Sequence, residues 1–128
     1  MKLIIAGSRT INLAPSEMDA VVCRYVPVAI HEIVCGMARG VDRHAHAWAE
    51  PYQRSGIYKI AEFPADWKRH GKAAGPIRNK QMADYADALL AIWDGRSAGT
   101  KNMIETMRRL GKQVWVCDKF GEPLEVPA

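Results

Sequence analysis

The sequence predicts an α/β fold, in which a parallel sheet of about five strands lies between two layers of helices. Short apolar segments of strand length alternate along the chain with segments that show helical periodicity. This alternation places a helix in each crossover between parallel strands, and the helices cover both faces of the sheet. The 128 residues, of which 48% are hydrophobic, are enough for a single domain with a substantial core.

Five apolar segments carry the strand prediction, at residues 2–6, 29–35, 57–63, 88–93 and 113–117. The fourth is apolar throughout, as expected of a strand that is buried on both faces. The third alternates in character, and the second is less regular because His31 and Glu32 interrupt it.

Helical periodicity and capping residues predict four helices, the first from Pro15 until Pro27, then residues 41–53, residues 77–85, and the last from Gly99-Thr100 until Gly111. Pro51 is unfavourable inside the second helix, so we expect an early end or a kink there, followed by Gly56 as a C-terminal cap. Residues 68–76 are basic and contain glycine, which favours an ordered loop with at most one helical turn.

Composition limits the classes of protein to which the chain can belong. Residues 1–118 are predicted to form one domain, and residues 119–128 a polar tail that frays. The formal net charge of +4 suits an anionic small ligand and only weakly supports nucleic-acid binding. No signal peptide or membrane-spanning segment is predicted. Cys23, Cys35 and Cys117 lie far apart beside apolar residues, which is typical of small core residues in a reducing compartment, so we expect a cytoplasmic protein.

Four of the predicted strands end in unusual loops, namely Gly7-Ser8-Arg9, residues 36–40, residues 64–67 and residues 94–100. The carboxyl ends of parallel strands meet at one edge of the sheet, and ligands bind at that edge in folds of this class. The glycine, arginine and aspartate residues of these loops therefore predict a binding site there.

Residues 94–100 are expected to form the centre of that site. Gly95 and Gly99 lack a Cβ atom, so the backbone can approach a phosphate closely, and Ser97 and Thr100 add hydroxyl donors. The free N–H groups in the first turn of the following helix point at the ligand, and the helix dipole favours an anion there. The alternative is an ordinary loop in which Thr100 is a simple N-cap.

Several segments of the chain match the motifs of a known family, and they are Gly7-Ser8-Arg9, residues 36–42 (GMARGVD), residues 64–67, residues 74–79, Met82, residues 86–88, residues 93–100 and residues 103–105. Together they resemble the YspA-like group of the SLOG superfamily, whose Rossmann-like domains include the cytokinin-activating LOG phosphoribohydrolases and the DNA-processing DprA proteins. The resemblance implies the strand order 3-2-1-4-5, which places the loops after the first and fourth strands side by side. It also implies a nucleotide-type ligand.

The LOG enzymes hydrolyse the N-glycosidic bond of nucleoside monophosphates, and Arg78, Met82 and Gly99-Thr100 match their motif. That motif has a glutamate three residues after the threonine, but Met103 stands at this position here. The nearest carboxylate, Glu105, lies about 200° further around the helix. The resemblance therefore supports phosphate binding more strongly than hydrolysis.

Three residues, Arg78, Asp66 and Asp94, are predicted to be catalytic if the ligand is turned over. A cation at a helix start opposes the helix dipole, and this placement suggests that Arg78 grips a phosphate. Asp66 and Asp94 would bind ribose hydroxyls or act as a general base. The alternatives are that Arg78 is a surface arginine and that Asp94 only shapes a turn.

The predicted ligand-binding residues are Gly7, Ser8, Arg9, Gly36, Arg39, Asp42, Trp67, Asn79, Gly95, Ser97, Gly99 and Thr100. Arg9 would contact a phosphate, and Trp67 would stack on a nucleobase or simply plug its loop. Arg39 and Asp42 have an alternative role as a local ion pair that holds residues 36–40.

Our first functional hypothesis is a sensor or binding module for a phosphorylated nucleoside or an ADP-ribose-like nucleotide derivative. The second is a LOG-like nucleotide N-glycosidase. The third, DprA-like binding of single-stranded nucleic acid, ranks last because no stripe of interleaved aromatic and basic residues occurs. The sequence has no metal-ligand spacing and no phosphate-loop or dinucleotide fingerprint, so no metal or cofactor is predicted. A homodimer is compatible with the resemblance, and no membrane partner is expected.

Overall fold

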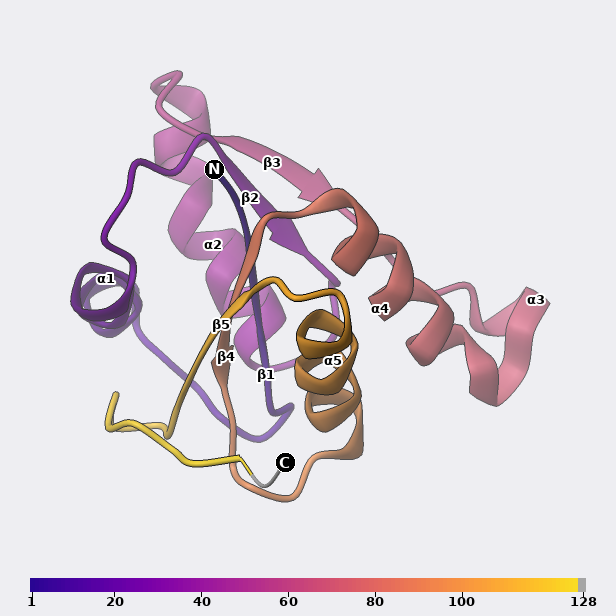
Figure 1. Ribbon diagram of the computed structural model, residues 1–128. Coiled ribbons are helices and arrows are strands. Elements are labelled where there is room, and N and C mark those ends of the chain that lie inside the picture. The colour runs from indigo at the N-terminus through magenta and orange to yellow at the C-terminus, as the bar shows by residue number, and fades with distance from the viewer. Residues whose placement is uncertain (127–128) are drawn as a thin grey trace.

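A five-stranded, wholly parallel sheet forms the centre of the computed structural model, which describes residues 1–126 (Figure 1). The strands are β1 (Lys2–Gly7), β2 (Glu32–Cys35), β3 (Lys59–Glu62), β4 (Ala88–Ile92) and β5 (Gln113–Cys117). They lie in the order β3-β2-β1-β4-β5, which confirms the α/β class and the expected order 3-2-1-4-5. β2 and β3 are shorter than predicted, since regular pairing between them starts only at Glu32 and Lys59.

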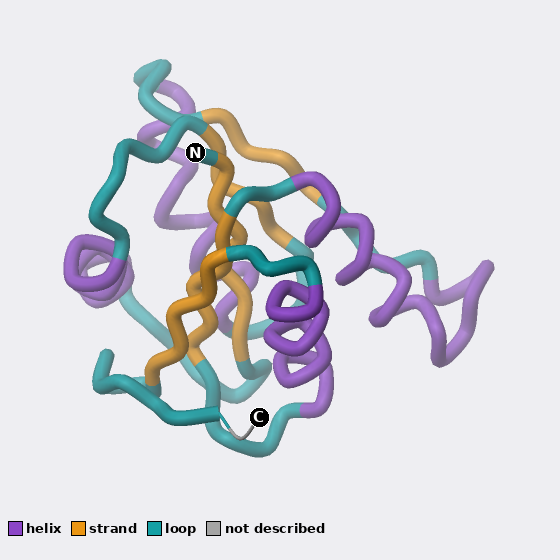
Figure 2. The backbone as a smooth tube through the Cα atoms, in the orientation of Figure 1, coloured by secondary structure: helices purple, strands orange, loops and turns teal. Residues whose placement is uncertain are grey.

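Helices cover both faces of the sheet, as predicted. They are α1 (Pro15–Tyr25), α2 (Val41–Arg54), α4 (Ala74–Tyr85) and α5 (Ala98–Arg109), with the short α3 (Trp67–His70) and the 3-10 turn η1 (Gly71–Ala73) between β3 and α4. α1 and α2 pack against one face of the sheet, and α4 and α5 against the other (Figure 1, Figure 2). Among the described residues, no helix combines the length and the apolar character needed to cross a membrane.

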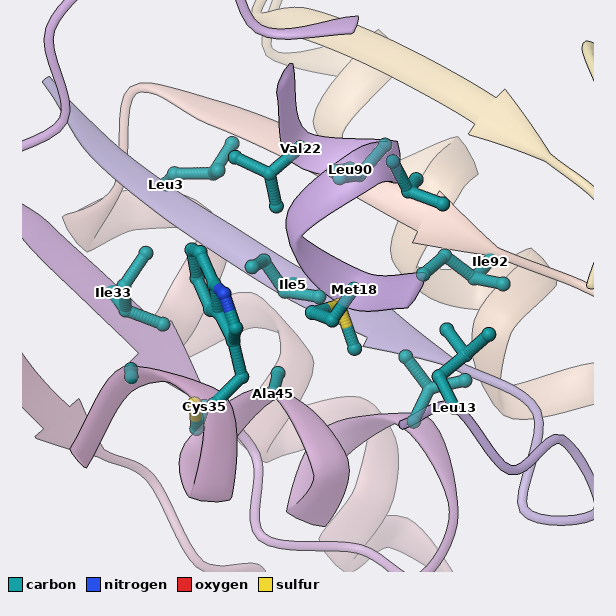
Figure 3. Close-up of a cluster of buried hydrophobic side chains, with 14 of the residues drawn as sticks. Leu3, Ile5, Leu13, Met18, Val22, Ile33, Cys35, Ala45, Leu90 and Ile92 are labelled. Atoms are coloured by element: carbon teal, nitrogen blue, oxygen red, sulfur yellow. The ribbon is translucent and has the colours of Figure 1, made fainter. Parts of the chain in front are cut away.

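Neighbouring strand residues contribute to two separate cores. Ile5 and Leu90 pack in one core with Met18 of α1 (Figure 3), while Ile4 and Leu89 pack against α4 and α5. All five side chains are fully buried. This alternation, with both faces covered, explains why β4 is apolar at every position.

α4 begins at Ala74 rather than at Ile77. The prediction of a loop with at most one helical turn at residues 68–76 is therefore wrong, because α3, η1 and the first turn of α4 occupy these residues. Gly75 and Pro76 lie within the first turn of α4. The first N–H groups of a helix have no partner within it, so proline there removes no hydrogen bond. The residues before α4 form α3 and η1, which extend away from the sheet (Figure 2).

α2 continues past Pro51 to Arg54, so of the two expected effects of Pro51, an early end or a kink, the early end is wrong. Pro51 is exposed in the last turn, where the backbone carbonyl that loses its helical partner belongs to the exposed residue Ala47. Gly56 then follows the C-cap residue Ser55 with a φ of +77°, which is the left-handed conformation predicted for it.

The tail does not fray over its described part, contrary to the prediction. Pro123 pairs with Cys117 in an antiparallel bridge, and the Leu124 N–H donates to the carbonyl of Val116. The Gly121 carbonyl accepts hydrogen bonds from the side chains of Arg24 and Tyr25. Residues 118–126 therefore fold back along β5, the last strand of the sheet, while the final two residues of the predicted tail lie outside the described range.

Two of the three cysteines lie in the core. Cys35 and Cys117 are buried, as predicted, but Cys23 is exposed on α1. It follows the buried Val22, and one helical step of about 100° turns its side chain to solvent.

Candidate functional site

The exits of β1, β2 and β4 enclose a pocket together with α4 and the start of α5. It has a volume of about 320 Å³, at the lower end of the range for small-molecule sites. We call it the α5 pocket. Its polar lining comes from Thr10 and from seven side chains that the sequence singled out, namely Arg9, Asp42, Arg78, Asn79, Asp94, Ser97 and Thr100. The structure therefore places these seven residues at one edge of the sheet.

The loop from β4 to α5 is shaped by Asp94. Its Oδ1 atom accepts hydrogen bonds from the N–H groups of Arg96 and Ser97, at 2.8 Å each, and Gly95, which directly follows Asp94, has a φ of +81°. These bonds, first of all the one from Ser97, lower the pKa of Asp94. Asp94 thus has the turn-forming role that was one of its two sequence-based interpretations, and it stays ionised at neutral pH while lining the pocket.

α5 begins at Ala98, with Ser97 as its N-cap residue, so the interpretation of Thr100 as the N-cap is wrong. The Ser97 hydroxyl lies 3.0 Å from that of Ser8, which ties the loop to the exit of β1. Gly99 occupies the second helical position, and a Cβ atom built on it would meet nothing within 4 Å. The N–H groups of this first turn have no acceptor within the helix, so the α5 pocket is bordered by open donors.

Asn79 of α4 holds the start of α5 in place. Its side-chain amide donates to the carbonyl of Gly99 at 3.1 Å and to Asn102 Oδ1 at 3.0 Å. Met103 lines the pocket and is buried, whereas Glu105 is exposed and paired with Lys101. The structure therefore presents a thioether, and no glutamate, at the position where the LOG motif has its carboxylate.

Arg78 is only 8% exposed and is held by several hydrogen bonds. Its Nε donates to Asn79 Oδ1 at 3.0 Å, and its Nη1 donates to the carbonyls of Gly36 and Phe63. Because α4 begins at Ala74, Arg78 lies in the second turn, and the dipole argument for its role does not apply. The interpretation of Arg78 as a surface residue is also wrong, since its guanidinium joins the exits of β2 and β3 while it lines the α5 pocket.

Asp42 is the buried carboxyl group of the pocket, with 4% of its surface exposed. Its Oδ1 accepts the N–H of Gly7 at 3.3 Å. Burial raises the pKa of Asp42 to about 6, although the nearby Arg78 charge acts in the opposite direction. The predicted ion pair with Arg39 does not form, and the Arg39 side chain is exposed. Asp42 is therefore the carboxyl group of this pocket that can hold a proton near neutral pH, a role that spacing alone did not reveal.

The glycines after β1 and β2 approach other parts of the protein. A Cβ atom on Gly7 would lie 2.0 Å from the Ile92 carbonyl oxygen, and one on Gly36 would lie 2.6 Å from Arg78 Nη1. Gly40 has a φ of +77°, and its Cβ would meet the Ser8 carbonyl at 2.4 Å. Of the predicted ligand-binding glycines, Gly7 and Gly36 therefore serve the packing of the loops.

A second pocket, of about 300 Å³, adjoins the first and shares Arg9, Ala38 and Arg78 with it. We call it the arginine pocket, since its lining includes Arg9, Arg39, Arg43 and Arg78, together with Trp67. Trp67 is 50% exposed, and a Cβ atom on Gly75 would lie 3.5 Å from its ring. Arg43 was not predicted, although a cation in the first turn of a helix is an unfavourable placement that marks it in the sequence.

Asp66 is not brought to either pocket. It is the N-cap residue of α3, where its Oδ1 accepts the N–H of Arg69 at 3.1 Å. Its neighbours Pro64, Ala65 and Trp67 line the arginine pocket instead. Over residues 1–126, no three histidine, cysteine, aspartate or glutamate side chains lie close enough together to hold a metal ion.

Comparisons with known proteins show the family of the chain. The model of the YspA, cpYpsA-related SLOG family matches residues 1–70, which include the exits of β1, β2 and β3. The Gene 61 protein of Mycobacterium phage D29 is 34% identical over 117 residues, which cover 86% of this chain and 90% of that protein. The first match covers more than half of the chain and the second extends the likeness over most of it, so this chain belongs to the YspA, cpYpsA-related SLOG family.

Proposed function

We propose that this protein binds a phosphorylated nucleoside or a nucleotide derivative of the ADP-ribose kind, with a phosphate at the start of α5. The observation that carries the proposal is the open first turn of α5. Gly99 faces empty space at a helix N-terminus, inside a pocket that Arg9 and Arg78 also line. Helix N-termini with free N–H groups bind phosphate, and a glycine there lets the phosphate approach the backbone. Membership of the SLOG family is in keeping with a nucleotide-related ligand.

The remaining polar groups of the α5 pocket suit the sugar of a nucleotide. Asp94 lines the pocket and is ionised, so its second oxygen can accept a hydrogen bond from a hydroxyl group. Asp42 lies deeper and can either accept or donate, depending on its protonation. A ligand with both a phosphate and adjacent hydroxyl groups suits this lining, because the phosphate can meet the first turn of α5 and the hydroxyl groups can meet Asp94 and Asp42.

One observation favours N-glycosidase activity as a second candidate function. The buried Asp42 carboxyl group has a raised pKa of about 6, which lies in the range that suits a general acid or base. Against it, Met103 occupies the position of the LOG glutamate, and Glu105 lies outside the pocket in a pair with Lys101. Binding without turnover is therefore the first proposal.

A thermal-shift experiment with AMP, ADP-ribose, NAD and cyclic nucleotides tests the proposal. A ligand at 100 times its dissociation constant stabilises the folded chain by about 2.7 kcal/mol, which raises the melting temperature by about 10 °C for a domain of this size. The Gly99→Val variant places a branched side chain where the phosphate would lie, so the shift should disappear. Chromatography of the same mixtures for a released base separates binding from glycosidase activity.

Ser16→Val is the matched control, because Ser16 is exposed and occupies the second position of α1, as Gly99 does in α5. It should keep the full shift. No shift with any nucleotide, or an equal shift in the wild type and Gly99→Val, would contradict the proposal.

A further inference from the structure

The arginine pocket is lined by positive charge and by no carboxylate. Its lining holds four arginines, Arg9, Arg39, Arg43 and Arg78, and no acidic residue. In the described part of the chain, none of these four forms an ion pair within 4.0 Å of a carboxylate oxygen. Clustered cations without carboxylate partners are typical of a surface that meets an anionic ligand.

The arginines are held near one another at a cost in free energy. Burial, together with the charges of Asp42 and Arg9, alters the pKa of Arg78, and the net effect lowers it. The Arg9 charge contributes to this lowering, so the two guanidinium groups repel each other. Arg43 lies in the first turn of α2, where a cation opposes the helix dipole. An anion placed among these side chains would relieve both kinds of repulsion.

The geometry of the two pockets allows one molecule to reach both. They share Arg9, Ala38 and Arg78, so these residues form a common wall. On one side of the wall is the open first turn of α5, and on the other are Arg39 and Arg43. The half-exposed ring of Trp67 adds a flat apolar surface beside those two arginines.

We propose that the ligand carries two separate anionic groups, one at the start of α5 and the second among the arginines of the arginine pocket, with a nucleoside between them. This inference rests on the proposed function and narrows it to nucleotides with phosphoryl groups on both sides of the sugar. A nucleoside monophosphate occupies only the first of the two anion positions. The arginine pocket then adds affinity and selects the ligand.

Calorimetric titration with three probes tests this inference. The probes are AMP, ADP, whose two phosphoryl groups are adjacent, and adenosine 3′,5′-bisphosphate, an isomer of ADP whose two phosphoryl groups are separated by the nucleoside. The bisphosphate should bind at least tenfold more tightly than AMP and more tightly than ADP. In the Arg43→Gln variant this advantage should fall to threefold or less, while the affinity for AMP changes less than twofold.

Arg54→Gln is the matched control, because Arg54 is an exposed arginine in the last turn of the same helix. It should keep the full advantage of the bisphosphate. Equal affinities for AMP and the bisphosphate, or an advantage that Arg43→Gln leaves intact, would overturn the inference while AMP binding still supports the proposed function. A 5′-phosphorylated pentanucleotide that binds tenfold more tightly than the bisphosphate would overturn it in favour of single-stranded nucleic acid. No binding of any probe would mean that the proposed function itself has failed.

Discussion

Two groups of glycines lie at the same edge of the sheet, and their surroundings differ completely. Gly7, the last residue of β1, and Gly36, directly after β2, have backbone or side-chain atoms within 3 Å of where a Cβ atom would be. Gly95, in the loop after β4, and Gly99, in the first turn of α5, have nothing within 4 Å of that point. The first group lets the protein pack against itself, and the second leaves space that only a ligand or solvent can fill. The comparison separates the residues that build the site from those that are available to bind.

The largest expected effect on stability comes from a glycine-to-alanine substitution in the first group of glycines, which is packed against other parts of the protein. Gly7→Ala would place its Cβ 2.0 Å from the Ile92 carbonyl, so β1 and β4 must separate or the loop must shift. We expect a loss of about 3 kcal/mol in the free energy of unfolding. Gly99→Ala is the paired change in the open group and should be neutral or stabilise the protein by up to about 1 kcal/mol. Urea denaturation measures both, and equal stabilities of the two variants would remove the distinction between the groups.

A second prediction concerns the pH dependence of stability that arises from Asp42, whose carboxyl group accepts the N–H of the packed Gly7. Burial raises its pKa to about 6 in the folded chain, above its ordinary value, so the folded state binds this proton more tightly than the unfolded state does. The resulting stabilisation is fully present below about pH 4 and is lost as the pH rises through about 6. In Asp42→Asn, which cannot titrate, this loss should be absent.

Denaturation of the wild type and Asp42→Asn at pH 4, 5, 6 and 7 measures this difference. The stability of the variant relative to the wild type should rise by about 2 kcal/mol across the series. A constant difference between the two proteins at all four values would show that Asp42 has no raised pKa.

The smallest effect is expected in the open region, at Asp94. Asp94→Ala removes the acceptor of two backbone hydrogen bonds in an exposed turn, which should cost about 1 kcal/mol. Asp94→Asn keeps an oxygen at the Oδ1 position and should stay within about 0.5 kcal/mol of the wild type. Thermal unfolding of the two variants checks the turn-forming role, and an equal loss in both would assign the effect to the charge of Asp94 instead.

Much of the architecture was predictable from the sequence because it depends on local periodicity. The all-apolar β4 indicated a strand that is buried on both faces of the sheet, and the strand-exit loops indicated the edge at which the α5 pocket lies. The start of α4 was missed because Gly75 and Pro76 usually break helices, and only their place in a first turn makes them compatible with one.

For the site, the sequence predicted which residues belong to it but not what each of them does. Loop composition indicated Asp94, the family resemblance indicated Arg78 and Asp42, and the structure places all three in the α5 pocket. Their separate roles depend on contacts between distant segments. The burial of Arg78 against the carbonyl of Gly36 and the raised pKa of Asp42 are examples. The same limit applies to the glycines, since nothing in a glycine-rich loop shows whether the missing Cβ would face protein or open space.

The most direct test is an NMR titration of the ¹⁵N-labelled chain with AMP, read at individual backbone amides. If the open region binds the phosphate, the largest changes in chemical shift should fall on Gly95, Ser97, Gly99 and Thr100, with smaller changes at Gly7 and Gly36. The amides of the opposite edge of the sheet, at the starts of β1 and β3, should not move. Saturating AMP that leaves the start of α5 unchanged, or that shifts only the opposite edge, would contradict the assignment of this pocket as the nucleotide site.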